Sequence, residues 1–328
     1  MKGVVYDRFG APEMLHLADV PMPELRPDDL LVRVAAAGVN RADLMQREGF
    51  YGDRHFGESA LLGLELAGEV VATGCAVTAF RPGERVMAIV GGGAYAAFAR
   101  VDQGMAARVP DGVSLVDAGA IMESFVTAWE AASHLAALAP GESVLVHAAA
   151  GGVGSAVVQV AHALGARVYA TAPASRLDAV RGIGAAMVFD YRTEDFEARI
   201  REETDGRGVD AVIDFVGGAW LARNLRSLRP GGRLVQVGIL SGEDDAVIPL
   251  NLLLHNHLRL IGTVMKSRTV DEKRAMIRRF AEGALPLFAQ GTLRPLVYRV
   301  FPFAQAAAAH AEMERGGGFG KILLTAQA

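Results

Sequence analysis

The sequence contains little cysteine and little net charge, and each shortage excludes a class of protein. Cys75 is the only cysteine among 328 residues, so neither a disulfide within the chain nor a cysteine-rich structural zinc site can form. The net charge is −4 and no dense basic run occurs, which argues against a nucleic-acid surface. The first residues include Asp7 and Glu13 and lack the apolar core of a signal peptide. We therefore expect a cytoplasmic protein.

Charged residues are also missing from one run of the chain, Ser143 to Ala166. The run consists mainly of Ala, Gly and Val, contains His147, Gln159 and His162, and is broken by Gly-Gly-Val-Gly. A membrane-spanning helix favours Leu, Ile and Phe and has no such break. We therefore predict a buried strand followed by a buried helix, and no association with a membrane.

The remaining pattern predicts two kinds of structure along the chain. With 51% hydrophobic residues, a large packed core is possible, and the length suggests two domains. Residues 1–115 predict mainly strands, with a short helix over 40–49. From Ser143, apolar strands alternate with helices, which is typical of a parallel sheet covered on both faces. The residues alone leave open whether the tail after residue 258 extends this second part or returns to the first.

The strand that begins at Ser143 leads directly into "AAGGVG" and a helix. Aligned with the dinucleotide pattern G-x-G-x-x-G, the sequence has Ala149, Gly151 and Gly154 at the three glycine positions. A glycine turn between a strand and a helix brings backbone amides, here those of Gly152 and Val153, to a pyrophosphate at the positive end of the helix. The alternative is a tight strand–helix turn without a ligand.

The end of the next strand indicates which dinucleotide is preferred. NAD is held by an acidic residue about 20 positions after the glycine turn. Here no acid occurs before Asp178, and Ser175 with Arg176 occupies the turn. A hydroxyl and a guanidinium bind a 2′-phosphate, so we predict NADPH as the cofactor. The alternative is that Arg176 only solvates the start of the following helix.

Several segments, in order, resemble the zinc-independent quinone oxidoreductases of the medium-chain dehydrogenase/reductase superfamily, the group that contains zeta-crystallin. The resemblance covers nearly the whole chain. It is carried by "AAAGVNRADLMQREGFYG", "LLGLELAGEVVATG", "RPGERVMAIVGGGAYAAFARV", "AHALGARVYATA" and "GKILLT".

The resemblance implies a fold and an assembly. The α/β fold would be a Rossmann-type doubly wound parallel sheet domain, residues 118–258, inserted in a GroES-like, β-rich catalytic domain, residues 1–117 plus 259–328. The active site would be the cleft between the domains, and the chain would form a homodimer.

Two positions suggest chemistry without a metal. Zinc-dependent relatives have Cys and His where this sequence has Asn40 in "GVNRAD" and Leu64 in "GLELAG". Leucine cannot bind a metal and asparagine is a poor zinc ligand. Alcohol oxidation normally needs the metal, whereas a quinone accepts hydride without a strong Lewis acid. We therefore predict NADPH-dependent reduction of a quinone.

The resemblance also implies roles for individual residues. Asn40 and Tyr51 would face the nicotinamide and the acceptor as the catalytic pair, although Asn40 also fits a helix N-cap and Tyr51 a loop aromatic. We assign no catalytic role to Asp43, Asp214 or His147, which fit a first-turn helix charge, a strand-end carboxylate and a packing residue. The residues implied to contact the cofactor are Asn40, Thr127, Gly151, Gly152, Val153, Gly154, Ser175, Arg176, Tyr191, Gly238, Ile239, Leu240, Thr263, Val264 and Lys321.

The sequence departs from the family pattern at two places. Gly318 stands where relatives often have Asn, so one cofactor contact would be lost. The segment Arg54-His55-Phe56 replaces a loop that is usually proline-rich and bears on the choice of acceptor. Two other functions stay open: an NADPH-dependent enoyl or α,β-enone reductase on the same scaffold, and a cofactor-binding structural or RNA-associated protein.

Overall fold

The computed structural model describes residues 1–50 and 59–326, and it divides into two compact units. The first unit comprises Met1–Glu123, Arg274–Ala289 and Arg294–Ala328. The second unit comprises Ser124–Lys273 and Gln290–Leu293. The second is thus inserted in the first, and the tail of the chain returns to the first unit.

The first unit is built mainly on antiparallel strands, with one parallel pair, β14 and β15, and strands are what the sequence predicts for residues 1–115. Its main sheet has the order β14-β15-β3-β4-β5-β7, with β6 also paired to β3, and β1 pairs with β2 separately. The strands are β1 (Lys2–Tyr6), β2 (Leu15–Asp19), β3 (Asp29–Val39), β4 (Glu65–Thr73), β5 (Arg85–Ile89), β6 (Phe98–Asp102), β7 (Ala106–Arg108), β14 (Val297–Pro302) and β15 (Lys321–Thr325). The helical elements are η1 (Pro12–Met14), α1 (Arg41–Glu48), η2 (Gln103–Met105), α2 (Leu115–Ala118), α9 (Val270–Gly283), α10 (Leu285–Ala289), η5 (Phe303–Gln305) and α11 (Ala306–Arg315).

The register of three strands in the first unit places polar residues together. In the antiparallel pair β15–β3, Ile322 lies opposite Val39, so Lys321 and Asn40 become neighbours where the two strands end. In the pair β3–β4, Ala37 lies opposite Leu66, which brings Glu65 to the same end. A core of buried apolar side chains from these strands, including Val32, Leu66 and Leu324, surrounds this end of the sheet.

The second unit has a parallel sheet with helices on both faces. Its strand order is β10-β9-β8-β11-β12-β13, and every pair is parallel. The strands are β8 (Ser143–Val146), β9 (Arg167–Ala172), β10 (Ala185–Asp190), β11 (Val209–Asp214), β12 (Leu228–Gln236) and β13 (Arg259–Gly262). The helical elements are α3 (Met122–Trp129), η3 (Glu130–Leu135), α4 (Gly152–Ala163), η4 (Ala174–Arg176), α5 (Leu177–Arg181), α6 (Phe196–Glu203), α7 (Trp220–Ser227) and α8 (Leu250–His255).

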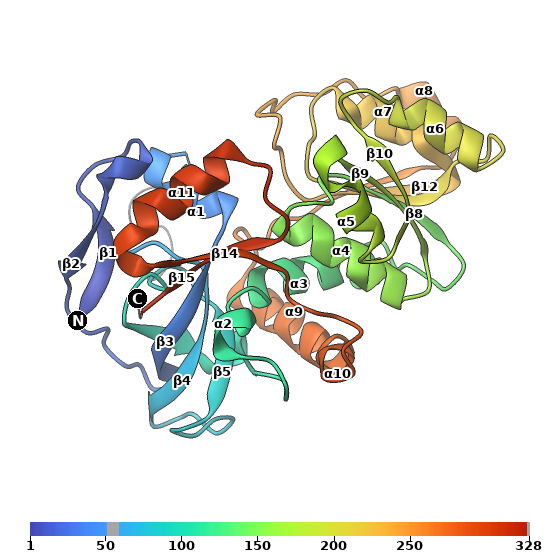
Figure 1. The fold of residues 1–328 in the computed structure, drawn as a ribbon. Coiled ribbons are helices and arrows are strands. Elements are labelled where there is room, and N and C mark those ends of the chain that lie inside the picture. The colour runs from blue at the N-terminus through green and yellow to red at the C-terminus, as the bar shows by residue number, and fades with distance from the viewer. Residues whose placement is uncertain (51–58, 327–328) are drawn as a thin grey trace. The chain divides into compact units, whose positions relative to one another are not determined.

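This arrangement is the parallel sheet covered on both faces that the strand–helix alternation predicts, and it is the doubly wound fold that the family resemblance implies. Figure 1 shows α4 and α5 on one face of the sheet and α6, α7 and α8 on the other. The chain order of the strands reverses between β8 and β11, which are neighbours. In open parallel sheets, ligands bind at the carboxyl ends of the strands at such a reversal point. The loop that follows β8 is therefore the expected ligand-binding position of this sheet.

This unit differs from the sequence-based expectation at β13 and agrees with it at the charge-free run. The structure adds β13 to its sheet, beside β12, whereas the sequence analysis placed residues from 259 onward in the catalytic domain. The reason is that β13 is an edge strand, partly exposed along its length, and lacks the two-sided apolar pattern of the central strands. The charge-free run forms β8 and the 12-residue helix α4. Within residues 1–50 and 59–326, no helix is both long and apolar enough to cross a membrane.

Candidate functional site

The glycine turn after β8 leaves backbone amides open to a ligand. Gly151 is the N-cap of α4 and provides no side-chain cap, and the first N–H groups of a helix have no acceptor within it. A Cβ atom at Gly154 would lie 2.2 Å from the Ala148 carbonyl oxygen, so only glycine permits this close approach. At the exposed Gly151, a Cβ would meet nothing closer than 3.4 Å. The turn therefore fits a pyrophosphate at the positive end of α4.

Most of the predicted cofactor residues gather at the same edge of this sheet. Because all six strands are parallel, the loops that follow them share one edge. The side chains of Ser175, Tyr191, Ile239, Leu240 and Val264 are exposed there. The hydroxyl of Thr263 accepts a hydrogen bond from Arg268 at 3.0 Å. The loops concerned are 147–154 after β8, 173–176 after β9, 191–192 after β10, 215–218 after β11, 237–241 after β12 and 263–264 after β13.

A second arginine at this edge was missed by the sequence analysis. Arg192 follows β10, the strand beside β9, and its guanidinium lies 5.7 Å from the centre of the Tyr191 ring. The Tyr191 ring also packs against Trp220, at 6.1 Å between ring centres. Arg192 and Arg176 thus follow adjacent strands. The signal available in the sequence was a basic residue directly after a predicted strand end.

His147 lies beneath the glycine turn in a chain of buried hydrogen bonds. Its Nε2 is 2.7 Å from Asn224 Oδ1 and its Nδ1 is 3.0 Å from Thr171 Oγ1. Asn224 Nδ2 donates to Asp214, whose carboxylate also accepts from the backbone N–H groups of the following turn. Burial lowers the pKa of His147 and thereby favours the neutral ring. Because the Asn224 oxygen can only accept a hydrogen bond, the neutral ring places its proton on Nε2. The side chain that we expected to be a packing residue thus joins β8, β9 and α7 beneath the cofactor edge.

In the first unit, Asn40, Glu65 and Lys321 form a buried group that we call the Lys321 cluster. The Lys321 ammonium donates to Val39 O at 3.0 Å, Asn40 Oδ1 at 2.5 Å and Glu65 Oε1 at 2.6 Å. The Asn40 amide donates to Gly38 O at 3.3 Å and Glu65 Oε1 at 3.1 Å. A Cβ at Gly38 would lie 2.1 Å from Glu65 Oε1, so that glycine makes room for the carboxylate.

This geometry accounts for every donor of two predicted site residues. The three hydrogens of Lys321 and the two amide hydrogens of Asn40 each have an acceptor within the protein. Asn40 stands at the N-cap position of α1, but its side-chain bonds go to Gly38, Glu65 and Lys321. Glu65 joins the cluster from the start of β4. Glu65 is absent from the predicted site residues, although a glutamate in the apolar stretch "GLELAG" was a visible signal.

The Lys321 cluster includes one of the two positions at which zinc-dependent relatives have metal ligands. Zinc needs a lone pair from each of its ligands. Leu64 has none, and the Asn40 oxygen already accepts a hydrogen bond from the Lys321 ammonium. Among the residues that the structure describes, no group of three or more His, Cys, Asp or Glu side chains is placed to hold a metal ion.

Asp43 lies in the first turn of α1 as expected, but it is fully buried rather than a surface charge. It accepts hydrogen bonds from Asn40 N at 2.8 Å, Gly63 N at 3.2 Å and Tyr95 Oη at 3.1 Å. The Tyr95 hydroxyl is also 3.3 Å from His310 Nε2. Burial raises the pKa of Asp43 to about 7, although the hydrogen bonds oppose the shift, and burial together with Arg47 lowers the pKa of His310 to about 3.

The other predicted residues have more limited descriptions. Thr127 lies on α3 and is partly exposed. A Cβ at Gly318 would lie 2.8 Å from the Tyr298 ring, which occupies the space where a larger residue would stand. Tyr51 and the segment Arg54-His55-Phe56 lie outside the described residues.

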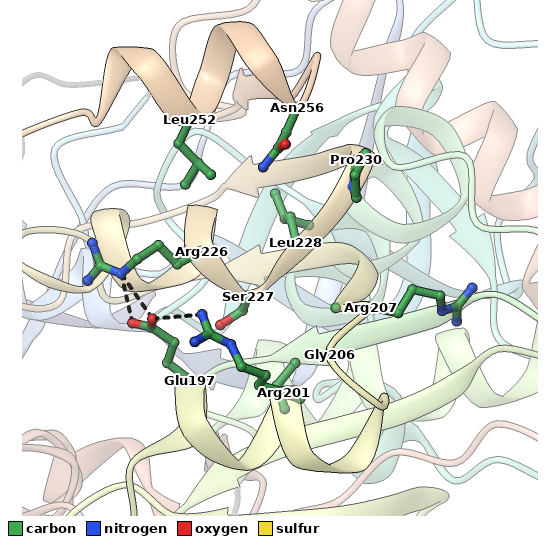
Figure 2. A pocket seen from close by; sticks show the side chains of 12 residues that line it. Glu197, Arg201, Gly206, Arg207, Arg226, Ser227, Leu228, Pro230, Leu252 and Asn256 are labelled. Carbon is green, nitrogen blue, oxygen red and sulfur yellow. Dashed lines mark hydrogen bonds and ion pairs between the residues drawn. The ribbon is translucent and has the colours of Figure 1, made fainter.

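The amino edge of the second unit's sheet has a pocket of about 300 Å³. Figure 2 shows Glu197 between Arg226 and Arg201, the former at 3.0 Å and the latter at 3.7 Å. Arg207 faces Asp210 instead, at 3.9 Å. Because carboxylates of the protein already compensate these guanidinium groups, the pocket is a weak candidate for an anionic ligand. The lining residues are Glu197, Ile200, Arg201, Gly206, Arg207, Gly208, Arg226, Ser227, Leu228, Pro230, Leu252 and Asn256.

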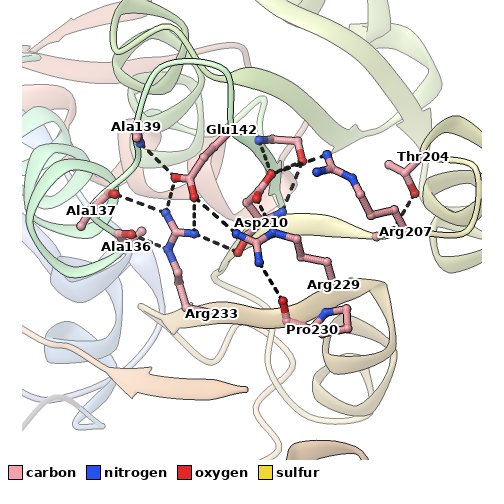
Figure 3. Close-up of polar contacts among 12 residues, drawn as sticks. Ala136, Ala137, Ala139, Glu142, Thr204, Arg207, Asp210, Arg229, Pro230 and Arg233 are labelled. Carbon is pink, nitrogen blue, oxygen red and sulfur yellow. Dashed lines mark hydrogen bonds and ion pairs between the residues drawn. The ribbon is translucent and has the colours of Figure 1, made fainter. Parts of the chain in front are cut away.

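Further ion pairs close the same edge (Figure 3). The buried Arg233 binds Glu142 and the carbonyls of Ala136 and Ala137, and Arg229 binds Asp210. The hydrogen bond from Arg233 holds the pKa of Glu142 below its ordinary value of 4.5. The two edges of the sheet therefore differ: one offers open backbone amides and arginines, and the other is occupied by paired charges.

Comparison with known proteins gives the family. A family model described as "Alcohol dehydrogenase GroES-like domain" matches residues 26–111, and one described as "Zinc-binding dehydrogenase" matches residues 152–282. The crystal structure of a quinone oxidoreductase from Pseudomonas syringae is 30% identical, with a TM-score of 0.88 over 99% of both chains. That of the CurK enoyl reductase is 27% identical, with a TM-score of 0.88 over 99% of this chain and 98% of that one.

The chain belongs to the medium-chain dehydrogenase/reductase superfamily, whose members are oxidoreductases that bind a nicotinamide cofactor. Among curated proteins, it is 37% identical over 314 residues to the spectinabilin polyketide synthase system protein NorB of Streptomyces orinoci, covering 93% of this chain and 14% of that protein. The chain spans 5% to 14% of the length of the curated relatives that it matches.

Proposed function

We propose that the chain is an NADPH-dependent quinone oxidoreductase that works without zinc. The observation that carries this proposal is the Lys321 cluster. Asn40 stands at one position where zinc-dependent relatives have a metal ligand, and its side-chain oxygen accepts a hydrogen bond from the Lys321 ammonium. Leu64, at the other position, offers no lone pair. Without a Lewis acid, an acceptor that stabilises its own negative charge is favoured over an alcohol.

The carboxyl edge of the second unit's sheet would hold the cofactor. The amides of Gly152, Val153 and Gly154 would bind the pyrophosphate, and Gly238, Ile239 and Leu240 would line the ribose. Ser175, Arg176 and Tyr191, joined by Arg192, would surround the 2′-phosphate of NADPH, since β9 ends without an acidic residue. When bound, the nicotinamide ring supplies hydride, which is two electrons and one proton.

The protein's part in the reaction is to orient the acceptor and stabilise the negative charge on its oxygen. Tyr51 would donate a hydrogen bond to that oxygen, while Lys321 and Glu65 hold Asn40 in place beside it. Losing one donor in a buried site costs about 10²- to 10³-fold in rate. A quinone delocalises its charge, so Tyr51→Phe is expected to lower turnover only about tenfold.

The test is a screen of ortho- and para-quinones and α,β-enones, followed by NADPH absorbance before and after exhaustive chelation. Quinone-dependent oxidation that survives chelation supports the proposal. Zinc that is lost together with activity would contradict the metal-free assignment. No turnover with any quinone, together with clear reduction of an enone, would contradict the quinone assignment.

The second candidate is an enoyl or α,β-enone reductase, favoured by the similarity to polyketide synthase proteins and to the CurK enoyl reductase. NADPH labelled with deuterium at C4 separates the two reactions. An enone product retains deuterium on the β-carbon, whereas a hydroquinone loses an exchangeable label to water.

We also propose a homodimer. The support is the edge strand β13, whose Leu260 is exposed, and the exposed Leu250 and Leu254 of the preceding helix α8. Sedimentation equilibrium measures the mass, and a monomer at micromolar concentration would refute this assembly.

A further inference from the structure

Glu123 lies one hydrogen bond away from the Lys321 cluster. It stands in the first turn of α3, and its backbone N–H donates to Glu65 Oε2 at 2.9 Å. The other oxygen of Glu65 holds both Lys321 and Asn40. The start of α3 is therefore fixed against the residues that we place beside the acceptor.

The other polar groups around Glu123 are committed to hydrogen bonds within the protein. The hydrogens of Asn40 and Lys321 are all engaged, and the carboxylates of Glu65 and Asp43 accept hydrogen bonds. The side chain of Glu123 differs, because its carboxyl group forms no hydrogen bond or ion pair with any residue that the structure describes. The Glu123 carboxyl group is therefore available to hold a proton and to donate it.

Glu123 shares its exposed helix face with a predicted cofactor residue. Residues 124–126 and Ala128 of α3 are buried, whereas Glu123 and Thr127 are partly exposed. Positions i and i+4 lie above one another on one face of a helix. If Thr127 contacts the nicotinamide ring as expected, Glu123 would stand one turn of α3 from that contact.

The surroundings of Glu123 favour its protonated form. A carboxylate in the first turn of a helix is normally stabilised by the helix dipole. Here the loss of solvation among the surrounding protein groups comes first, followed by the charges of Glu65 and Asp43, and these raise the pKa of the partly exposed Glu123 to about 7 against the opposing effect of Lys321. The Glu123 carboxyl therefore exchanges its proton near neutral pH, as a general acid must.

We propose that Glu123 is the general acid that supplies the proton accompanying hydride transfer, an inference that rests on the proposed reductase function. The O–H bond of Glu123 breaks and a new bond to hydrogen forms on the acceptor, at the oxygen of a quinone or the α-carbon of an enone. The electron pair of the broken bond stays on the Glu123 carboxylate. Water then returns a proton to it, so one hydride and one proton are consumed in each turnover.

The rate test is Glu123→Gln, which retains the backbone bond to Glu65 and the size of the side chain. General acid catalysis contributes about 10²- to 10⁴-fold, and we expect a loss near the low end in kcat with little change in KM for NADPH. The wild-type kcat should fall as pH rises through about 7, and the variant should lose this dependence. The control is Glu13→Gln, an exposed glutamate in the first turn of η1, which should match the wild type.

A second measurement needs neither cofactor nor turnover. Infrared spectra of wild type minus Glu123→Gln should show a protonated carboxyl band that disappears as pH rises through about 7. Absence of this band overturns the proposal even if the rate falls. Wild-type turnover with an unchanged Glu123→Gln rate also overturns it and leaves the proposed function standing. Absence of wild-type turnover with quinones and enones overturns both.

Discussion

Lys321 holds together the buried polar residues of the first unit. Its ammonium and the Glu65 carboxylate are almost fully buried, so water cannot take the place of either partner. Removing one partner of a buried ion pair leaves an uncompensated charge, which costs more than the pair itself contributes. This cluster is therefore expected to be as important for stability as for the site.

Lys321→Met should lower the free energy of unfolding by about 3–5 kcal/mol, because Glu65 is left buried without a cation. Lys2→Met is the control, since Lys2 pairs with Asp19 on the surface, where solvent screens the pair and its loss should leave the unfolding free energy nearly unchanged. Urea unfolding measures both. Equal losses in the two variants would show that the Lys321 cluster contributes no more than a surface ion pair.

Arg176→Ala and Arg192→Ala should each weaken NADPH binding and spare NADH. A hydrogen bond to a charged group contributes about 1.5–3 kcal/mol, which corresponds to about 10- to 150-fold in Kd. Arg181→Ala is the control, because Arg181 pairs with Asp178 on the exposed side of α5. Fluorescence titration gives the dissociation constants. If NADPH and NADH weaken equally, the arginine supports the loop and does not read the 2′-phosphate.

Among the elements, α4 and the turn before it depend most on one residue type. Gly154→Ala should force the Ala148 carbonyl to move, because the new Cβ would lie 2.2 Å from its oxygen. We expect a loss of about 1–3 kcal/mol in unfolding free energy, as for other overpacked sites, and weaker nucleotide binding. Gly262→Ala is the control, since a Cβ there meets nothing within 4 Å. Similar behaviour of both variants in urea and in NADPH titrations would contradict this role of Gly154.

The elements also show what local sequence can predict. β3 lies in the region that was predicted to be mainly strands, and β8, its glycine turn and α4 were expected because all of their signals lie within one short stretch. The Lys321 cluster was not, since the contact between Asn40 and Lys321 joins residues 281 apart. Glu123 was missed for a different reason: a glutamate in the first turn of a helix is ordinary in sequence. Only the fold brings Glu65 beside it.

Each unit of the molecule has its own buried core. In the second unit, the two edges of the sheet carry different kinds of residues. Its amino edge is occupied by ion pairs around Glu142, Asp210 and their arginines. Its carboxyl edge has the glycine turn and the exposed loops. We expect mutations at the amino edge to change stability and those at the carboxyl edge to change binding.

Glu142→Gln should lower the stability of the second unit by about 2–4 kcal/mol at neutral pH, because Arg233 stays buried without its carboxylate. The folded pKa of Glu142 lies below its ordinary value of 4.5, so its contribution is complete above that pH and is lost as pH falls through the folded value. The difference between wild type and variant should therefore shrink in acid. Urea unfolding at several pH values checks this, and a constant difference would contradict it.

NADPH should stabilise the molecule from one edge of this sheet only. At 100 times its Kd, a ligand that binds only the folded chain adds about 2.7 kcal/mol. Amide hydrogen exchange should slow most in residues 148–154, 173–176, 191–192 and 237–241, because their backbone lies at the carboxyl ends of the strands. Residues 206–208, beside the pocket at the opposite edge, should exchange as before. Slower exchange at that pocket, with no change in the glycine turn, would place the nucleotide among the amino-edge arginines instead.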